Sequence, residues 1–238
     1  MKTTTAASQY KGYRFPTEII SHCVWLYFRF SLSFRDVEEL MAQRGVVLTY
    51  ETVRQWCLKF GQTYANELRK RSPRCGDTWH MDEVVLTIRG KKHSLWRAVD
   101  QHGNVLDVLV QSRRNKQAAK RFFRKLLKVL EYVPRVIITD KLASYGAAKK
   151  ELLASVEHRQ HTRLNNRAEN SQQPTRLRER KMRRFKSAGH APRFLSAFGP
   201  ISSHFPPRRH RLSAREYRAT LQRQFQVWNE VTDMNKVS

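Results

Sequence analysis

The stretch TWHMDEVVLTI, residues 78–88, decides the fold class of this chain. β-Branched and aromatic residues dominate it without helical spacing, a pattern that is typical of a strand. The stretch follows a break marked by Pro73 and Gly76, before which apolar residues recur at helical spacing. We therefore predict that a helical region ends near this break and that a sheet begins with this strand.

The residues that follow continue the sheet and then cover it. HSLWRAVD (93–100) and VLDVLVQS (105–112) flank the turn QHGN (101–104), and together they predict a hairpin. NKQAAKRFFRKLLKVL (115–130) predicts an amphipathic helix with Asn115 as its cap. Strands and helix in this order indicate a mixed α/β layer.

Three helices are predicted before the break. The first covers residues 17–30 with Thr17 as its cap, and the second begins at Ser33. The third covers residues 49–60 and ends at Gly61. The last two form a helix-turn-helix candidate, and the outward residues of its second helix are Tyr50, Glu51, Arg54, Gln55 and Lys59. The alternative is an ordinary helical hairpin that does not contact DNA.

The chain is strongly basic. Among its 238 residues, 46 Lys and Arg stand against 20 Asp and Glu, which gives a net charge of +26. The field of such a protein attracts anions, and nucleic acid is the first candidate partner. With 40% hydrophobic residues, 12 Phe, 8 Tyr and 5 Trp, the chain carries too much apolar area for an intrinsically disordered protein. We therefore expect a folded protein that binds a polyanion.

Cysteine usage and hydropathy indicate the compartment. Cys23, Cys57 and Cys75 are odd in number and form no C-x-x-C pair, which argues against a disulfide framework and against a zinc ribbon. The longest apolar stretch, CVWLYF at 23–28, is far shorter than the ~20 residues that span a bilayer, and no signal-peptide pattern opens the chain. We expect a cytoplasmic protein without membrane contact.

Acidic residues are scarce from residue 71 onward, so each one there stands out. Asp82 lies within an apolar strand. Asp140 directly follows RVIIT (135–139), an apolar run typical of a strand that is buried on both faces of a parallel or mixed sheet. Glu169 stands at the head of the arginine-rich run LNNRAENSQQPTRLRERK at 164–181. A buried carboxylate is costly unless it is hydrogen-bonded, paired or bound to a metal.

Each of these three carboxylates has a structural explanation and a chemical one. Asp82 can form a buried salt bridge, and Asp140 can cap the next turn. NRAE at 166–169 resembles a capping box in which Asn166 is the cap and Glu169 the third residue. The chemical explanation is a metal site, because Mg²⁺ takes oxygen ligands and keeps several waters, so that a few carboxylates suffice. Two such ions ~3.5–4 Å apart serve phosphoryl transfer.

Several separated motifs, in the correct order, resemble the DDE transposases of bacterial insertion sequences, specifically the insertion sequence six family. The motifs are WHMDEV around Asp82, VIITDKLASYGAA around Asp140, VEHRQH at 156–161 and LNNRAEN around Glu169, and the similarity runs from about residue 14 to 220. The resemblance implies an α/β fold with a ribonuclease-H-like, retroviral-integrase-like catalytic core, preceded by a helix-turn-helix domain that binds terminal inverted repeats. The expected location is the bacterial cytoplasm, in association with the nucleoid.

The resemblance also implies the site residues and the reaction. Asp82, Asp140 and Glu169 match the three acids, which would bind two Mg²⁺ ions, or Mn²⁺ in their place. An oligomer, at least a dimer, would cut DNA and join the freed 3′-hydroxyl to target DNA, by a replicative route that forms a cointegrate. The residues expected to contact DNA are Tyr50, Arg54, Gln55, Lys59, Arg176, Arg180, Arg183 and Arg184. Neighbours within the motifs, to which we assign no chemistry, are Trp79, His80, Glu83, Lys141 and Asn166.

The expected organisation has four parts. They are a basic tail (1–14), the helix-turn-helix domain (15–72), the ribonuclease-H-like DDE catalytic domain (73–200) and a basic, helical C-terminal extension (201–238). Ser213 is the predicted cap of the helix in the extension.

One departure and three alternatives accompany this assignment. Pro174 lies in the helix expected to carry Glu169 and predicts a kink or an early end of that helix. The protein can instead be a non-enzymatic helix-turn-helix regulator whose acids are structural, or a ribonuclease-H-like nuclease that cleaves without joining. A metal site built from His158, His161 and Cys75 is disfavoured, because the spacing is loose and no paired Cys is present.

Overall fold

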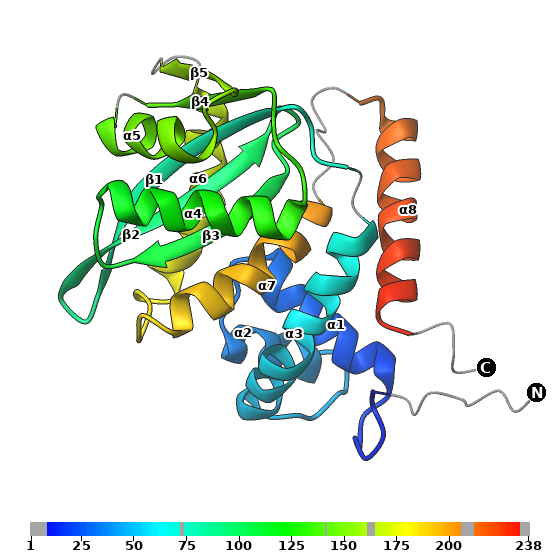
Figure 1. Ribbon diagram of the computed structural model, residues 1–238. Coiled ribbons are helices and arrows are strands. Elements are labelled where there is room, and N and C mark those ends of the chain that lie inside the picture. Colours follow the sequence, from blue (N-terminus) through cyan, green and yellow to red (C-terminus); the bar gives the residue numbers. More distant parts are fainter. Residues whose placement is uncertain (1–8, 72–73, 141, 161–164, 206–211, 234–238) are drawn as a thin grey trace, which may run out of the picture.

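The computed structural model describes residues 9–71, 74–140, 142–160, 165–205 and 212–233. In chain order its elements are α1 (Thr17–Arg29), α2 (Phe34–Ala42), α3 (Tyr50–Arg71), β1 (Thr78–Ile88), β2 (Lys91–Asp100), β3 (Val105–Gln111), α4 (Lys116–Leu130), β4 (Val136–Thr139), α5 (Ala143–Leu152), β5 (Glu157–Gln160), α6 (Asn166–Lys181), α7 (His190–His204) and α8 (Ala214–Val231). Figure 1 shows the sheet with α4 and α5 in front of it, the N-terminal helices below it, and α8 to one side.

The five strands form one mixed sheet in the order β3-β2-β1-β4-β5. β1 is antiparallel to β2 and parallel to β4, while β2 and β3 are antiparallel and β4 and β5 parallel. The predicted hairpin is therefore present, with a register shift between Ala98 and Val99. An antiparallel meander on one side of β1 and parallel strands on the other form a ribonuclease-H-like arrangement, so the predicted fold class is confirmed.

Alternation along β1 gives the sheet two different faces. Trp79 and Met81 lie in a core that also contains Phe122 of α4 and Tyr145 of α5. Val84 lies in a second core, which it shares with α7 and the N-terminal helices. The two faces of one strand thus serve two separate cores.

The helix caps test local predictions. Asn115 caps α4 as predicted, because its side chain accepts a hydrogen bond from the Ala118 amide at 3.0 Å. Ser33 and Ser213 each form a capping box at the start of α2 and α8, which confirms both serine caps. The predicted cap at Thr17 is wrong, because Thr17 lies inside α1 and Pro16 precedes the helix without a side-chain cap.

α3 is longer than predicted. It runs from Tyr50 to Arg71 and passes through Gly61, so the predicted end of the helix at that glycine is wrong. A Cβ at Gly61 would lie 2.6 Å from Cε2 of Phe28 in α1. The glycine therefore allows α1 and α3 to approach closely and does not end the helix.

The helical region and the sheet share a core. Buried side chains of α1, α3, α7 and β1 form one cluster that crosses the expected boundary between residues 72 and 73. The expected boundary between residues 200 and 201 falls inside α7, which packs on α3 and β3. The Tyr10 hydroxyl lies 2.5 Å from that of Tyr64 in α3, and Tyr10 is buried. Tyr10 and Tyr13 therefore pack on Phe60 of α3, although residues 1–14 were expected to be a loose tail.

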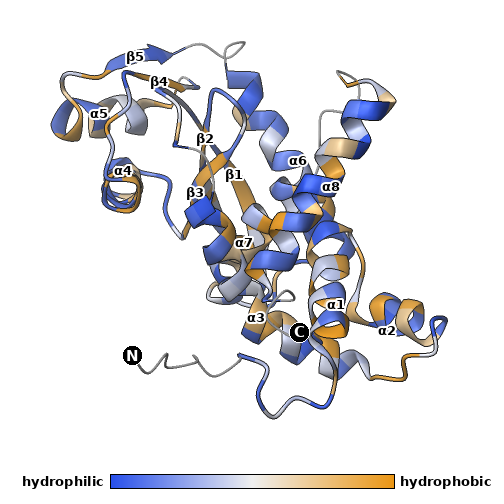
Figure 2. Ribbon diagram, turned by 90° about the vertical axis from the view of Figure 1, so that its right-hand side faces the viewer, coloured by the Kyte–Doolittle hydropathy of each residue, from blue (hydrophilic) through white to orange (hydrophobic). Residues whose placement is uncertain are grey.

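Hydropathy follows this arrangement. In Figure 2, hydrophobic residues gather where the helices meet the sheet and each other, whereas α6 is mainly hydrophilic. Among the described residues, no helix combines the length and the apolar character needed to cross a membrane.

Candidate active site

Neighbouring parallel strands place two of the predicted acids side by side. Met81 of β1 is in register with Thr139 of β4, and the residue after each is an aspartate, Asp82 and Asp140. Adjacent strands lie ~4.8 Å apart, so the two aspartates occupy adjacent positions of the sheet. Asp140 also lies at the carboxyl end of β4, where α/β sheets commonly bind ligands.

The start of α6 brings the third acid near Asp82. Asn165, which is fully buried, donates a hydrogen bond from Nδ2 to the Met81 carbonyl oxygen at 2.9 Å. This bond fixes the start of α6 next to Asp82, and Glu169 follows one turn later on an exposed position. Burial raises the pKa of Asp82 above its ordinary value, and the negative charges of Asp140 and Glu169 raise it further. The three carboxylates therefore lie close enough to interact electrostatically.

Of the three structural explanations, only the one for Asp140, a cap of the next turn, is confirmed. α6 begins at Asn166 after Asn165, without a side-chain cap, so Glu169 does not belong to a capping box. Asp140 accepts a hydrogen bond from the Leu142 amide at 3.0 Å, which uses one of its carboxylate oxygens. In the part of the chain that the structure describes, Asp82 forms no ion pair within 4.0 Å.

Pro174 does not end the helix that carries Glu169. α6 continues through Pro174 to Lys181, so the predicted early end is wrong. A proline lacks the amide that would bond the carbonyl four residues earlier, here that of Asn170. The helix nevertheless stays continuous where it packs on β1 and β2.

Arg97 is a buried cation next to Asp82 that the sequence analysis missed. It is the cross-strand partner of Asp82 in β2. Its guanidinium donates to the Ser171 carbonyl oxygen at 2.6 Å and to Oγ1 of Thr175, both in α6. Burial lowers the pKa of Arg97 to about 10, and the charge of Asp82 acts in the opposite direction. Arg97 thus ties the helix of Glu169 to the strand beside Asp82.

Glu83 of β1 and Arg114 form an ion pair. The side chain of Glu83 points to the opposite face of the sheet from that of Asp82. Glu83 Oε1 accepts from Arg114 Nε at 2.8 Å, and Arg114 Nη2 also lies 3.9 Å from Asp140 Oδ2. Burial raises the pKa of Glu83, while the hydrogen bond from Arg114 lowers it. Arg114 therefore bridges a buried glutamate and a predicted metal ligand. The sequence signal was the acid directly after Asp82, to which we had assigned no chemistry.

The donor set fits a hard divalent cation. Within the ranges that the structure describes, no three His, Cys, Asp or Glu side chains lie close enough together to form a ready metal cage. Magnesium sites do not need one, since they are built from one or two carboxylates with waters and substrate phosphates. The disfavoured site of His158, His161 and Cys75 has no support in the structure. His158 Nε2 lies 2.9 Å from Oγ1 of Thr139, and His161 lies outside the described residues.

The predicted DNA-contacting residues of α3 lie on its surface. Tyr50, Arg54, Gln55 and Lys59 are all exposed. Arg54 donates to Glu51 at 2.6 and 2.7 Å, and Gln55 Nε2 donates to the same carboxylate at 3.3 Å. Glu51 thus orders the side chains on this face of α3.

The arginines predicted to contact DNA in the second half of the chain differ in exposure from Arg178, which lies among them in the sequence. Arg176, Arg180, Arg183 and Arg184 are exposed, and the last two have positive φ values of 51° and 71° at the end of α6. Arg178, in the same run, is fully buried.

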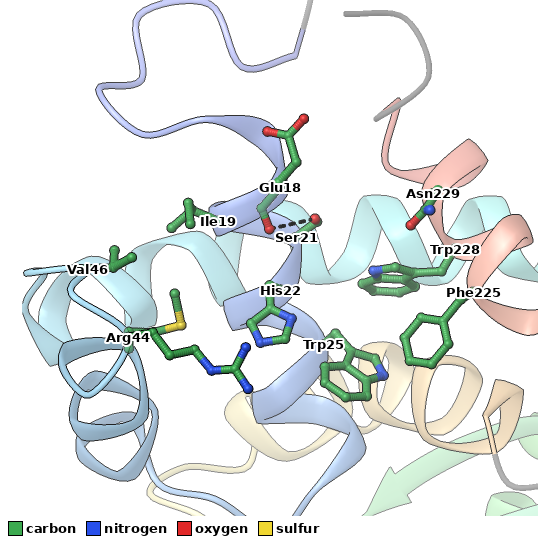
Figure 3. Close-up of a pocket in the computed structure, with 11 residues that line it drawn as sticks. Glu18, Ile19, Ser21, His22, Trp25, Arg44, Val46, Phe225, Trp228 and Asn229 are labelled. Carbon is green, nitrogen blue, oxygen red and sulfur yellow. Dashed lines mark hydrogen bonds between the residues drawn. The ribbon is translucent and has the colours of Figure 1, made fainter. Parts of the chain in front are cut away.

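A cavity of about 410 Å³ lies between α1, α2 and α8, and it contains none of the predicted site residues. Figure 3 shows Trp25, Phe225 and Trp228 on one side of it and Arg44 and Val46 on the other. Aromatic side chains dominate the α8 side, and we assign this cavity no role in the carboxylate site.

Comparisons with known proteins agree with the resemblance. A family model described as a DDE domain matches residues 76–206. Two Staphylococcus aureus proteins, the transposase for insertion sequence-like element IS431mec and the transposase for insertion sequence element IS257 in transposon Tn4003, are 29% identical over 140 residues. These matches cover 59% of this chain and 62% of each relative, so the chain spans less than two thirds of their length. The uncharacterized protein pYV0051 of Yersinia pseudotuberculosis is 37% identical over 78 residues, which are 32% of this chain and 73% of that protein.

Solved structures show a weaker similarity. The HTLV-2 integrase catalytic core domain in complex with magnesium (trimeric form) gives a TM-score of 0.40 at 12% identity, over 56% of this chain and 88% of that one. The catalytic core domain of BIV integrase gives 0.39 at 14% identity, over 63% and 97%. The strand order of the sheet carries the fold assignment without them. Because the DDE-domain model matches more than half of the chain, the protein belongs to the DDE-domain family of insertion-sequence transposases.

Proposed function

We propose that the protein is a metal-dependent transposase that cuts DNA at the ends of an insertion sequence and joins the ends to target DNA. The observation that carries this proposal is the placement of three carboxylates on adjoining elements, with Asp82 on β1, Asp140 at the end of the neighbouring strand β4, and Glu169 on α6, whose start is bonded to Met81. In a chain of net charge +26, a cluster of like negative charges calls for a bound cation.

Asp82, Asp140 and Glu169 are the proposed ligands of two Mg²⁺ ions, for which Mn²⁺ can substitute. When bound, such a pair activates the attacking oxygen and stabilises the leaving oxygen of an in-line phosphoryl transfer. The reaction forms no covalent bond between DNA and protein. Water attacks first, and the freed 3′-hydroxyl of the element then attacks a phosphodiester of the target.

The chain's own residues orient these ligands. Arg97 holds α6 against β2, which fixes the helix that carries Glu169. Arg114 lies beside Asp140 and limits where that carboxylate can turn. The hydrogen bonds of Arg97 go to Ser171 and Thr175 and those of Arg114 go to Glu83, which leaves the oxygens of the three proposed ligands available for metal.

DNA would be held at two places. The exposed face of α3 with Tyr50, Arg54, Gln55 and Lys59 would read the bases of the terminal inverted repeats. The arginines at 176, 180, 183 and 184 would bind backbone phosphates in a salt-dependent way. We further propose that at least a dimer holds both element ends and that the reaction follows a replicative route through a cointegrate.

A strand-transfer assay tests the proposed function. The substrate is a duplex with the inverted repeat that flanks the gene, supplied either uncut or with a free 3′-hydroxyl, in the presence of Mg²⁺. The parent protein is expected to give joined product from both substrates, and Asp140→Ala is expected to give none. Glu157→Gln, an exposed residue of β5 that pairs with Arg159, serves as the control.

Three results separate the alternatives. Unchanged joining by Asp140→Ala would sink the catalytic assignment. Cleavage without joining, even from pre-cut ends, would identify a nuclease. Binding of the repeat with neither reaction in Mg²⁺ or Mn²⁺ would identify a regulator whose acids are structural.

A further inference from the structure

Arg178 differs from every other arginine of its run. It is 0% exposed and lies in α6, whereas Arg176 and Arg180, two residues to either side, are exposed. A spacing of two residues turns a helix by about 200°, so these neighbours point away from the side on which Arg178 lies. Arg178 therefore cannot bind phosphate as the rest of the run does.

The guanidinium of Arg178 binds the N-terminal helices. Its Nη1 donates to the Phe30 carbonyl oxygen at 3.2 Å and to the Leu32 carbonyl oxygen at 2.5 Å, both in the connection from α1 to α2. Its Cζ lies 4.1 Å from the ring centroid of Tyr27 in α1 and 5.6 Å from that of Phe194 in α7. One side chain of α6 thus contacts α1, α7 and the entry to the helix-turn-helix candidate.

These contacts are a poor source of stability. Among the described residues, Arg178 forms no ion pair, and its Nε and Nη2 are buried without a hydrogen-bond partner. Carbonyl oxygens and ring faces compensate only part of the cost of burying a cation. An apolar side chain of similar size would fill the same space at no such cost. The cation instead fixes where α6 docks, because its Nη1 binds the carbonyl oxygens of Phe30 and Leu32.

The other half of α6 is tied to the carboxylate site. Asn165 binds the Met81 carbonyl, and Arg97 binds Ser171 and Thr175. From Glu169 to Arg178 the helix rises about 14 Å, or 1.5 Å for each of nine residues. α6 therefore links the carboxylate site, at one end, to the helix-turn-helix candidate, at the other.

A second contact joins the same end of α6 to α2. Lys181 Nζ is 3.8 Å from Asp36 Oδ2, and Asp36 belongs to the capping box that starts α2. This pair is half-exposed and contributes little by itself. Of the two contacts between α6 and the N-terminal helices, the one made by Arg178 is the buried one.

We propose that Arg178 is a positioning residue that sets where the carboxylate site lies relative to the DNA-binding helices, and so selects which phosphodiester at the element end is cut. This inference rests on the proposed function. The α2–α3 unit, bound to the repeat, and Glu169, at the scissile phosphate, are held at a fixed separation only while Arg178 keeps α6 docked on the connection from α1 to α2.

The test maps the cut at nucleotide resolution. A 5′-labelled duplex with the flanking inverted repeat joined to neighbouring DNA is incubated with protein and Mg²⁺, and the products are resolved on a denaturing gel. The main variant is Arg178→Met, which fills the same space and packs on Tyr27 and Phe194 without a cation. Arg178→Lys restores a donor, and Arg124→Gln, an exposed residue of α4, is the charge-matched control.

The parent, Arg178→Lys and Arg124→Gln are expected to cut at one position. Arg178→Met is expected to spread its cuts over neighbouring phosphodiesters while it still binds the duplex. A loss of stability alone would lower the yield of cuts and leave their position unchanged. A single cut at the parent position in Arg178→Met therefore overturns the inference, whatever its yield.

Two further outcomes have a defined meaning, namely a variant that does not fold and a parent protein that does not cut. If Arg178→Met does not fold, Arg178→Gln decides by the same reading, because it removes the buried charge and its side chain ends two atoms short of the guanidinium nitrogens that bind the Phe30 and Leu32 carbonyl oxygens. An unchanged cut in that variant overturns the inference, and a spread supports it. If the parent itself does not cut in Mg²⁺, the proposed function fails, which is distinct from a parent and a Met variant that cut alike.

Discussion

Arg114 shows how single residues shape the candidate site. Its guanidinium is bound to Glu83, whose side chain is only 1% exposed, and it also lies beside Asp140. The glutamate has a raised pKa because it is buried, so it depends on the arginine to remain charged. Arg114 therefore keeps Glu83 charged beside the proposed metal ligands and balances its charge.

We predict that Arg114→Gln lowers the free energy of unfolding by about 1–3 kcal/mol, because it leaves the Glu83 carboxylate buried with a weaker donor. Glu83→Gln in the same chain is expected to recover part of this loss, since the uncompensated charge is then gone. Denaturant unfolding of both single variants and the double variant measures the coupling. Additive effects would show that the pair does not act as a unit.

Residue identity alone predicted only part of the site. Asp82 and Asp140 stood out because an acid in or after an apolar strand is rare. Arg97 and Arg114 could not be found in this way, since their roles depend on which residue lies across the sheet or at the end of a neighbouring strand. A chain with 46 basic residues offers no local signal for the few that turn inward.

At the scale of elements, α6 carries the largest difference between sequence and structure. Its buried residues Ala168, Gln172, Thr175 and Arg178 recur at intervals of four, three and three, which is helical spacing. Three of them are polar, so hydropathy does not reveal the stripe. The predicted DNA contacts within this helix were Arg176 and Arg180, and the structure places Arg178, which lies between them in the sequence, in the interior.

The close approach of α1 and α3 gives a prediction at this scale. Gly61→Ala would place Cβ 2.6 Å from the Phe28 ring, which the packed interface cannot absorb without a shift. We expect a loss of about 1–3 kcal/mol in the free energy of unfolding. Gly189→Ala is the control, because no atom lies within 4 Å of the Cβ there. Equal stability of the two variants in thermal or denaturant unfolding would contradict the packing described for Gly61.

The contact of α7 with α8 predicts a pH dependence. His204 Nε2 lies 2.9 Å from the Gln224 carbonyl oxygen, and burial lowers the pKa of His204 below its ordinary value of 6.5. Above pH 6.5 the imidazole is neutral in both states and has no effect. As the pH falls below 6.5, the unfolded chain binds the proton more readily, so the free energy of unfolding decreases.

Denaturant unfolding across a pH series checks this sign. His204→Gln is expected to flatten the loss of stability below pH 6.5. It should not abolish the loss, because the pKa values of His22, His158 and His190 are also lowered by burial. A variant with the same pH dependence as the parent would show that His204 does not contribute.

At the scale of the whole molecule, the topology determines the fold and the net charge determines the nonspecific affinity for DNA. The β2–β3 hairpin and the buried strand β4 follow from patterns in the sequence, whereas the order of the strands was implied only by the resemblance to a ribonuclease-H-like core. The shared core of the N-terminal helices with α7 was not legible in the sequence, because it joins residues that lie more than 100 positions apart. The net charge of +26 in turn predicts nonspecific DNA affinity, whatever the contacts within the fold.

Salt dependence measures that affinity. Replacing Arg183 and Arg184 by Gln is expected to reduce the slope of log affinity against log salt by about 2, because each phosphate contact contributes about 0.9. Both side chains are exposed at the end of α6. The measurement is fluorescence anisotropy of a labelled duplex over a salt series. An unchanged slope would remove these two residues from the DNA-contacting set.

The central claim is that Asp82, Asp140 and Glu169 form one metal site. Anomalous diffraction from crystals grown with Mn²⁺ tests it most directly. The account predicts Mn²⁺ peaks bounded by carboxylate oxygens of all three residues, and it predicts their loss in Asp82→Asn. Ordered Mn²⁺ elsewhere in the chain, with none contacting Asp82 or Asp140, would contradict the site.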